Sequence, residues 1–418
     1  MWRGLSLRPG SRRGGFVLAA WLGLAGVLPG AGLTNATDRE IQFWQARVPR
    51  DESDHVAPTR LGLACLQKAR ESGEADWYER AERAFREALR RNPEHASARA
   101  ALASALNSRH QFREALPLAE RAAREQPNDP FPWGILGDAR QELGDLAGAK
   151  KAYDQMMTLD PGLFGYSRLA GWHWITGQAQ AALAASLTAL EQGRARGVPV
   201  ENLAWGEIQV GALHFRAGRF DEAEARYQAA LKILPGFHLA EDHLAELRAA
   251  QGRFDEAAER FEQLAERTRR PEYWHAVGDV HVAARRSEQA KPWHDRALAA
   301  YRQAAGASNV HYYHHLAAFY ADVRADGVES EKWARRDLEV RPNLYAWDAL
   351  AWALFWKGDY AAALEAMKKA LASGTQDAHL LAHAGSIFVR AGKISEGRAF
   401  MQQAEKINPR LSEFHAHR

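Results

Sequence analysis

The chain contains a single cysteine, Cys65, among its 418 residues. One thiol cannot form an intramolecular disulfide, and it cannot supply the several thiolates that a cysteine-based zinc or iron–sulfur site needs. We expect Cys65 to lie in an early helix as a small buried hydrophobic residue. The fold must therefore be stabilised by an apolar core, for which a chain of this length is ample.

The sequence also lacks an excess of one charge. Its formal net charge is +3, but residues 1–36 contain four arginines and no acidic residue, so the rest of the chain has a net charge of −1. Nucleic-acid binding depends on lysines and arginines that neutralise phosphates. A nearly neutral body lacks that feature, so we do not expect nucleic acid as a partner.

Catalytic motifs are missing as well. We find no glycine-rich loop that would hold a phosphate, no G-x-S-x-G nucleophile turn and no pair of carboxylates in a catalytic setting. His238 and His243 flank two acidic residues, but they stand five residues apart and fall on different faces of a helix. The sequence therefore predicts a protein that is not an enzyme and has no cofactor.

No apolar run is long enough to cross a membrane. The longest, 16–28, would span only about 20 Å as a helix, whereas a bilayer core is about 30 Å thick. Arginines precede this run and small residues follow it, which is typical of a secretory signal peptide. We expect residues 1–36 to be this peptide, with cleavage after Ala36 or near Ala31 and Gly32. The mature protein would then be periplasmic or extracellular, without stable membrane insertion; an uncleaved membrane tether is the alternative.

A fixed period organises the rest of the chain. Three prolines, Pro93, Pro127 and Pro161, are spaced 34 residues apart. Between the second and third prolines the sequence reads W-x2-L-G, then A-x3-Y, then P, carried by the residues Trp133, Leu136, Gly137, Ala149, Tyr153 and Pro161. This pattern resembles the tetratricopeptide repeat, a helix–turn–helix unit of 34 residues.

The resemblance implies an all-α fold, a right-handed superhelical solenoid of about ten helix–turn–helix repeats over residues 60–409. Residues 37–59 would be a linker or N-terminal cap, and 410–418 a C-terminal tail. Small residues at positions 137, 211, 278 and 385 would let paired helices approach closely. Glycines at positions 144, 218, 252, 358 and 392 would end the first helices in a left-handed turn. The stretch 193–199 would be a longer connection.

In proteins of this family the first helices of the repeats line a concave groove that binds peptides or protein surfaces. Aromatic side chains supply large contact areas at low entropic cost, so a groove rich in them suits such a ligand. The repeat frame predicts these inward-facing residues: Phe131, Asp138, Trp172, Trp205, Phe215, Asp242, His275, Asp279, His311, His314, Tyr345, Asp348, Trp352 and Trp356. The alternative is that several of the tryptophans pack between repeats.

Histidines gather in one part of the chain. His311 and His315 have the i, i+4 spacing that places two imidazoles on one helix face, and His275 and Asp279 precede them by one repeat. These four residues are weak candidates for a metal site, because zinc needs three or four ligands in fixed geometry and nothing in the sequence imposes that geometry.

The leading hypothesis is an exported, non-enzymatic scaffold that binds a protein or peptide in its aromatic groove. One alternative is a metal-binding protein or metal-dependent enzyme that uses the region from His275 to His315. Another is an assembly subunit that forms a homo-oligomer through its C-terminal repeat.

Overall fold

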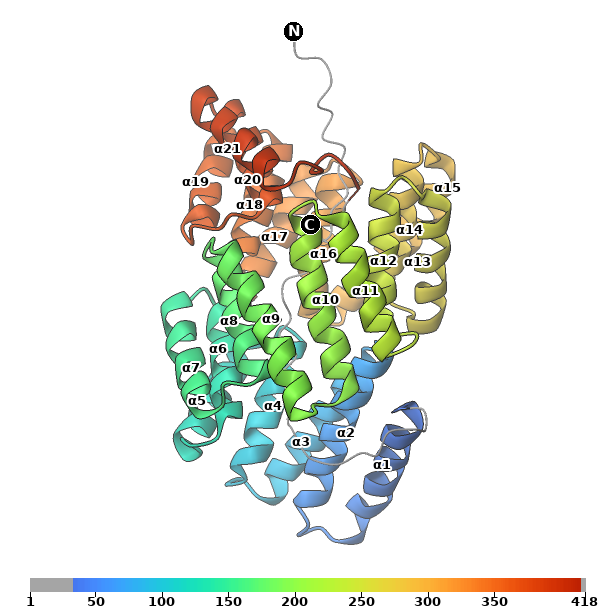
Figure 1. Ribbon diagram of the computed structural model, residues 1–418, viewed down its shortest axis with the longest axis vertical. Coiled ribbons are helices and arrows are strands. Elements are labelled where there is room, and N and C mark those ends of the chain that lie inside the picture. The colour runs from blue at the N-terminus through green and yellow to red at the C-terminus, as the bar shows by residue number, and fades with distance from the viewer. Residues whose placement is uncertain (1–32, 415–418) are drawn as a thin grey trace. The chain divides into compact units, whose positions relative to one another are not determined.

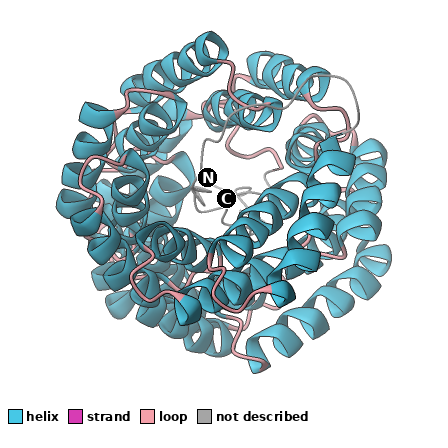
Figure 2. Ribbon diagram, turned by 90° about the horizontal axis from the view of Figure 1, so that it is seen from below, coloured by secondary structure: helices cyan, strands magenta, loops and turns pink. Residues whose placement is uncertain are grey.

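The computed structural model describes residues 33–414, and within that range every regular element is a helix (Figure 2). The elements in chain order are α1 (Leu33–Arg47), η1 (Val48–Arg50), α2 (Val56–Ser72), α3 (Asp76–Arg91), α4 (Ala96–Ser108), α5 (Phe112–Glu125), α6 (Pro130–Glu142), α7 (Leu146–Leu159), α8 (Leu163–Ile175), α9 (Ala179–Arg196), α10 (Val200–Arg216), α11 (Phe220–Ile233), α12 (His238–Ala250), α13 (Phe254–Thr268), α14 (Pro271–Ala283), α15 (Ser287–Gly306), η2 (Val310–Tyr312), α16 (Tyr313–Asp322), α17 (Gly327–Val340), α18 (Leu344–Lys357), α19 (Tyr360–Leu371), α20 (Ala378–Arg390) and α21 (Ile394–Ile407). The expected signal peptide, apart from its last four residues, lies outside the described residues.

Helices α2 to α21 form consecutive pairs, each joined by a short turn, so the structure contains ten helix–turn–helix repeats (Figure 1). In most repeats the two helices of a pair pack against each other, and the second helix also packs against the first helix of the next pair. This confirms the all-α repeat fold and the expected number of repeats. The first repeat begins at Val56, four residues before the position expected from the sequence.

The helices of a pair approach closely where the first one carries a small residue. A Cβ atom added at Gly137 would lie 2.2 Å from the ring of Tyr153, and one added at Gly211 would lie 2.5 Å from the ring of Tyr227. Contacts that short do not occur between real atoms, so a larger residue at position 137 or 211 would push the pair apart. This confirms that the small residues allow the paired helices to approach closely.

The turn inside each repeat requires a left-handed residue. Gly144 has φ +82°, and glycines 218, 252, 358 and 392 also have positive φ, as the sequence predicted. In the seventh repeat an exposed arginine, Arg285, takes the same position with φ +61°. A residue with a Cβ is strained in this conformation by roughly 1 kcal/mol or more.

The stretch 193–199 is mostly helical, so the expectation of a long connection there was wrong. Helix α9 continues to Arg196, and α10 begins at Val200. The residues Arg194, Ala195 and Arg196 are good helix formers, and the chain reverses over only three residues after them. The extra length of this repeat therefore lies in longer helices and not in a loop.

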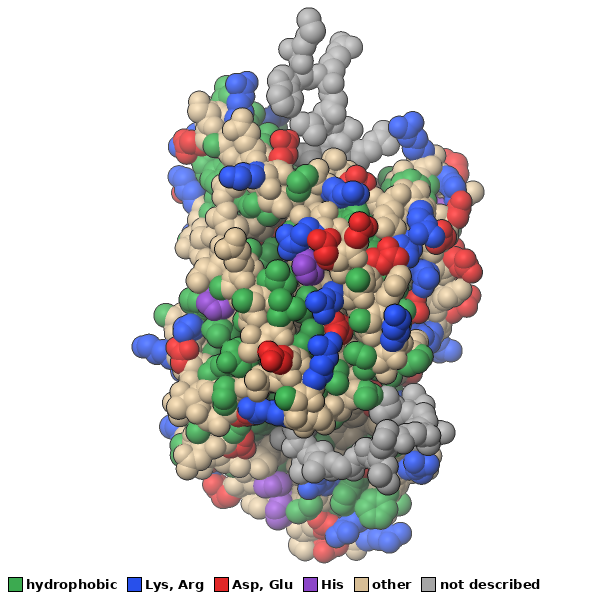
Figure 3. Space-filling view, viewed as in Figure 1, with side chains coloured by type: hydrophobic (Ala, Val, Ile, Leu, Met, Phe, Trp, Pro, Cys, Tyr) green, Lys and Arg blue, Asp and Glu red, His purple; other side chains and the backbone are tan. Residues whose placement is uncertain are grey.

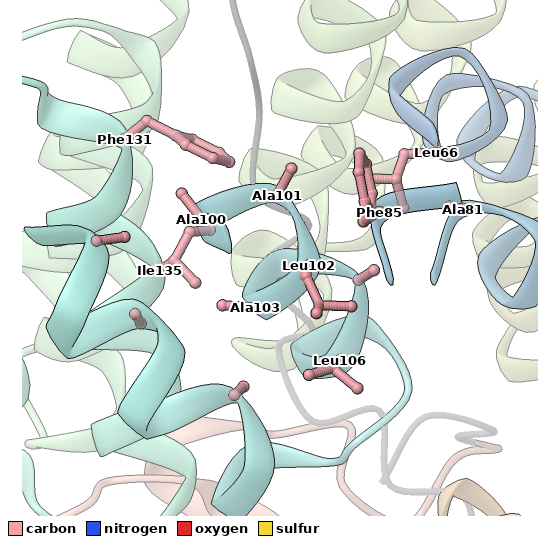
Figure 4. Packing of buried hydrophobic residues seen from close by; sticks show 14 of the residues in the cluster. Leu66, Ala81, Phe85, Ala100, Ala101, Leu102, Ala103, Leu106, Phe131 and Ile135 are labelled. Carbon is pink, nitrogen blue, oxygen red and sulfur yellow. The ribbon is translucent and has the colours of Figure 1, made fainter. Parts of the chain in front are cut away.

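The described residues form two compact units. The N-terminal unit comprises 33–169 and 185–206, and the C-terminal unit comprises 170–184 and 207–414, so α8, α9 and α10 contribute to both. In the N-terminal unit, side chains from α2, α3, α4 and α6 build a continuous core around Leu66, Phe85, Leu106 and Ile135 (Figure 4). Cys65 belongs to this core, and burial raises the pKa of its thiol to about 11, which makes it unreactive, as expected.

Helix α1, which contains residues expected to form a linker or cap, packs against α2. Thr37 donates a hydrogen bond of 3.0 Å to Glu71, and Lys68 pairs with Asp38 at 2.7 Å. Ile41 enters the core of the N-terminal unit. The first repeat is therefore covered on its outer side by one additional helix.

A buried carboxyl group joins the two ends of the N-terminal unit. Glu201, in the first turn of α10, lies beside Arg70 of α2 with Nε and Oε2 3.8 Å apart, and both side chains are largely buried. Burial raises the pKa of Glu201 to about 8, although the Arg70 guanidinium lowers it. Glu71 lies close enough to raise this pKa further.

The C-terminal unit closes on itself through its turns. A Cβ atom at Gly177, in the turn between α8 and α9, would lie 2.1 Å from the carbonyl oxygen of Gly374, which precedes α20. The guanidinium of Arg410 lies over the ring of Phe220 at the start of α11, and Phe414 packs against the core formed by α13 and α14. The turn before the last repeat and the residues that follow it therefore contact other helices of the same unit.

Among the described residues, no helix is both long enough and apolar enough to cross a membrane. Lys and Arg side chains are interspersed with Asp and Glu over the visible surface of α11 to α15 (Figure 3). Many of them form ion pairs between adjacent helices, such as Arg260 with Glu241 and Arg286 with Asp255. The mixed charge agrees with the near-neutral body expected from the sequence.

Substitution of Glu201 by Gln should flatten the dependence of stability on pH. Between pH 4.5 and about 8 the unfolded chain has released the Glu201 proton that the folded chain still holds, so stability falls as pH rises through this window. The Gln variant cannot ionise and should lose this part of the decline. Chemical denaturation of both proteins at several pH values would measure it, and parallel profiles would contradict the prediction.

Substitution of Arg285 by Gly should raise the free energy of unfolding by roughly 1 kcal/mol, because glycine adopts positive φ without steric cost. Arg285→Ala serves as the control, since alanine removes the charge and keeps the Cβ atom. Urea titration would measure both variants. An equal gain in the alanine variant would mean that charge, and not backbone strain, is responsible.

Candidate functional site

One face of α18 carries four of the predicted inward-facing residues, Tyr345, Asp348, Trp352 and Trp356, spaced about one helical turn apart. Trp352 is buried and stacks on the ring of His383 from α20, with centroids 4.0 Å apart and planes 10° apart. His383 Nδ1 lies 3.0 Å from Asp348 Oδ1. Tyr345 and Trp356 stay half-buried at the two ends of the row. We call the four residues on α18, together with His383, the α18 row.

The α18 row is also joined to the preceding repeat. The indole Nε1 of Trp352 donates a hydrogen bond of 2.8 Å to Asp322 Oδ1, at the end of α16. First helices of three successive repeats, α16, α18 and α20, therefore share one network. The two buried members fix this network in place, and the two half-buried aromatics leave apolar surface open to solvent.

Three side chains meet at the junction of α14 and α16. Glu272, in the first turn of α14, has Oε1 3.5 Å from His311 Nε2 and 3.9 Å from His315 Nε2. Arg270 donates a hydrogen bond of 2.8 Å to the same oxygen. Burial works to raise the pKa of Glu272, but Arg270 and the hydrogen bond from His311 outweigh it and hold that pKa well below its usual range. We call Glu272, His311 and His315 the Glu272 cluster.

A second group lies deeper, between α14 and α15. His294 Nε2 is 2.8 Å from Asp279 Oδ1, and His275 Nε2 is 3.5 Å from Asp279 Oδ2. All three side chains are buried, and the rings of Tyr301 and Phe319 pack beside His275. We call His275, Asp279 and His294 the Asp279 cluster.

The Asp279 cluster repeats an arrangement found in the third repeat. There, Tyr153 donates to Asp138 at 3.1 Å, and Arg168 donates to both oxygens of the same carboxylate. Asp138 follows Gly137 as Asp279 follows Gly278, and a Cβ atom at Gly278 would lie 2.2 Å from His294. His294 thus occupies the position of Tyr153, which indicates that the Asp279 cluster is a packing element.

The remaining predicted residues differ in exposure. Phe131 and Phe215 are buried, Phe131 in the core of the N-terminal unit and Phe215 stacked on Phe220. Asp138, Asp242 and His314 are buried too. Trp172 and Trp205 are half-buried, as is His311.

The four metal candidates, His275, Asp279, His311 and His315, do not form one group. The structure assigns two of them to each cluster, and each cluster contains a third residue that sequence reasoning missed. Those residues are Glu272 and His294. His294 could have been found, because it stands 16 residues after Gly278, as Tyr153 does after Gly137. No repeat position identifies Glu272, whose role depends on how α16 packs on α14.

Comparison with known proteins finds one family. Models of the tetratricopeptide repeat match residues 74–139, 132–162, 164–235, 214–280 and 349–411, together well over half of the chain. No curated protein sequence matches the chain.

Comparison with solved structures finds several similar chains. A dimer of human IFIT1 with PPP-AAAA is 17% identical and has a TM-score of 0.50, covering 81% of this chain and 77% of that one. TTC0263, a thermophilic TPR protein of Thermus thermophilus, is 20% identical with a TM-score of 0.40, covering 46% and 97%. PilW, a type IV pilus biogenesis factor, is 17% identical with a TM-score of 0.41, covering 49% and 93%.

Two substitutions of His294 should separate packing from chemistry in the Asp279 cluster. His294→Tyr introduces the residue that pairs with Asp138 in the third repeat, so we expect the free energy of unfolding to stay within about 1 kcal/mol of the parent. His294→Ala leaves a cavity and a buried carboxylate without its partner, which should cost about 3 kcal/mol. Denaturation curves would test both, and an equally large loss for tyrosine would show that the imidazole itself is required.

Proposed function

Because the chain belongs to the tetratricopeptide-repeat family, whose members are generally non-catalytic scaffolds that bind proteins, we propose that it is an exported scaffold that binds a peptide segment of a partner protein. The segment would lie along the first helices of the repeats in the C-terminal unit. The near-neutral charge of residues 37–418 supports a protein ligand over a nucleic acid.

The observation that carries this proposal is the α18 row. A binding surface gains most from aromatic side chains that are already fixed, because little conformational entropy is then lost on binding. Trp352 is fixed by its stacking on His383 and its hydrogen bond to Asp322. Tyr345 and Trp356 flank it and keep part of their rings exposed. Peptide side chains would pack on these two rings.

Fewer of the predicted groove residues are therefore expected to contact the ligand. Phe131 lies in the core and Asp138 belongs to a buried ion pair. Residues of this kind would support the repeats without touching the ligand. The half-buried aromatics of the C-terminal unit, Tyr345 and Trp356 together with Trp172, would make the contacts. Trp205 belongs to the N-terminal unit and is not part of this proposed surface.

The proposal that the protein is exported rests on the signal-peptide pattern of residues 1–36. Helix α1 begins at Leu33, so cleavage near Ala31 and Gly32 would leave it whole, whereas cleavage after Ala36 would remove its first turn. Either site keeps Thr37, which bonds to Glu71. Cell fractionation and N-terminal sequencing of the purified protein would test this part, and a retained Met1 on a cytosolic protein would refute it.

Replacement of Tyr345 and Trp356 by alanine should weaken partner binding at least tenfold, because both substitutions remove exposed aromatic contact area. The partner would first be identified by co-purification with the mature protein, and its dissociation constant then measured for each variant. Trp347→Ala is the matched control. Trp347 lies on another face of the same helix, under the ammonium group of Lys369 at 4.0 Å. Unchanged binding in the double variant, or an equal loss in the control, would overturn the proposed surface.

A further inference from the structure

We infer that the Glu272 cluster is a binding site for a divalent transition-metal ion of the zinc type. Glu272, His311 and His315 each offer one ligand atom, and these atoms all lie within 4.8 Å of one another. Two imidazole nitrogens and one carboxylate oxygen form a ligand set that suits zinc and its neighbours in the first transition row.

The spacing of the three atoms fits such an ion. Metal–ligand bonds of about 2.1 Å in a tetrahedral arrangement place the ligand atoms about 3.4 Å apart. Glu272 Oε1 lies 3.5 Å from His311 Nε2 and 3.9 Å from His315 Nε2. The ligand atoms of His311 and His315 lie within 4.8 Å of each other. Rotation of these side chains would bring the three atoms closer to the tetrahedral spacing.

The surroundings hold the ligands in place. The Asn309 side chain accepts a hydrogen bond from the backbone N–H of His311 and so fixes the start of η2. The ring of Tyr301 lies parallel to that of His315, 4° apart in plane with centroids 5.4 Å apart. Rigid supporting contacts of this kind are what raise the affinity of a metal site.

The second carboxylate oxygen of Glu272 is also left unsatisfied by the part of the protein that the structure describes. Glu272 is more than nine-tenths buried, and its Oε2 has no hydrogen-bond partner among the described residues. A buried carboxylate oxygen without a partner costs free energy, and a cation bound at the carboxylate would offset that cost.

Arg270 is the natural competitor of the metal ion. Its guanidinium donates to Glu272 Oε1, the oxygen that faces both histidines, and supplies the positive charge that Glu272 otherwise lacks. The Arg270 side chain is 28% exposed, so it can turn toward solvent when an ion binds. The metal affinity of the site therefore depends on how much more strongly the metal ion binds the Glu272 carboxylate than the Arg270 guanidinium does.

His311 is the most exposed member of the cluster, with 23% of its side chain accessible, so solvent reaches the site beside it. Three protein ligands and one open position are typical of sites where water or another molecule completes the coordination. The Asp279 cluster has no comparable access, because its three side chains are all buried.

Zinc binding to the full chain, purified without a polyhistidine tag, tests the inference. Isothermal titration with Zn²⁺ should give one ion per chain, and Co²⁺ should give the visible absorption of a four- or five-coordinate site. His311→Gln and His315→Gln should each weaken binding at least tenfold. Arg270→Gln should strengthen it severalfold, a gain that misfolding cannot produce.

His294→Tyr is the matched control, since it changes a buried histidine outside the Glu272 cluster; zinc affinity should not change. Circular dichroism would verify that each variant keeps its helical content. The inference fails if neither the parent nor Arg270→Gln binds one equivalent of zinc. It also fails if binding persists unchanged in the folded His311→Gln and His315→Gln variants, because the ion would then reside elsewhere.

Discussion

The two helices of a repeat pack closely only where the first helix has a residue too small to clash with a ring of the second. Gly137 under Tyr153, Gly211 under Tyr227 and Gly278 under His294 all meet this steric constraint. The close approach buries the ring almost completely. In the third and seventh repeats it also brings the aspartate that follows the glycine, Asp138 or Asp279, within reach of the polar end of the ring. In these two repeats, packing and polar pairing therefore have the same origin.

Burial also limits which polar residues are available for binding. Asp138, Asp279 and Asp348 all lie on first helices, where a ligand would bind, yet each is paired with a neighbouring side chain of the fold. A buried carboxylate needs such a partner. What remains for recognition are aromatic edges at half-buried positions and the histidines at the junction of α14 and α16.

The fold was predictable from the sequence because every part of its signal is local. The 34-residue spacing, the small residue at 137 and the left-handed glycine at 144 act within one helix pair. The candidate sites were only partly predictable. Asp348 and Trp352 share one face of α18, but their partners His383 and Asp322 come from other repeats. Glu272 contacts His311 from the preceding repeat, a contact set by how two helices pack and not by any spacing in the chain.

The contacts of Gly177 with Gly374 and of Phe220 with Arg410 link segments that are far apart in sequence. Most helix pairs of a solenoid need only the preceding pair, so they can form progressively as the chain leaves the ribosome. The C-terminal unit departs from that order: the turns after α8 and α10 stay uncovered until the last repeat exists. Its completion should therefore be a late and slow event, because closing so long a loop costs entropy that only the final contacts recover.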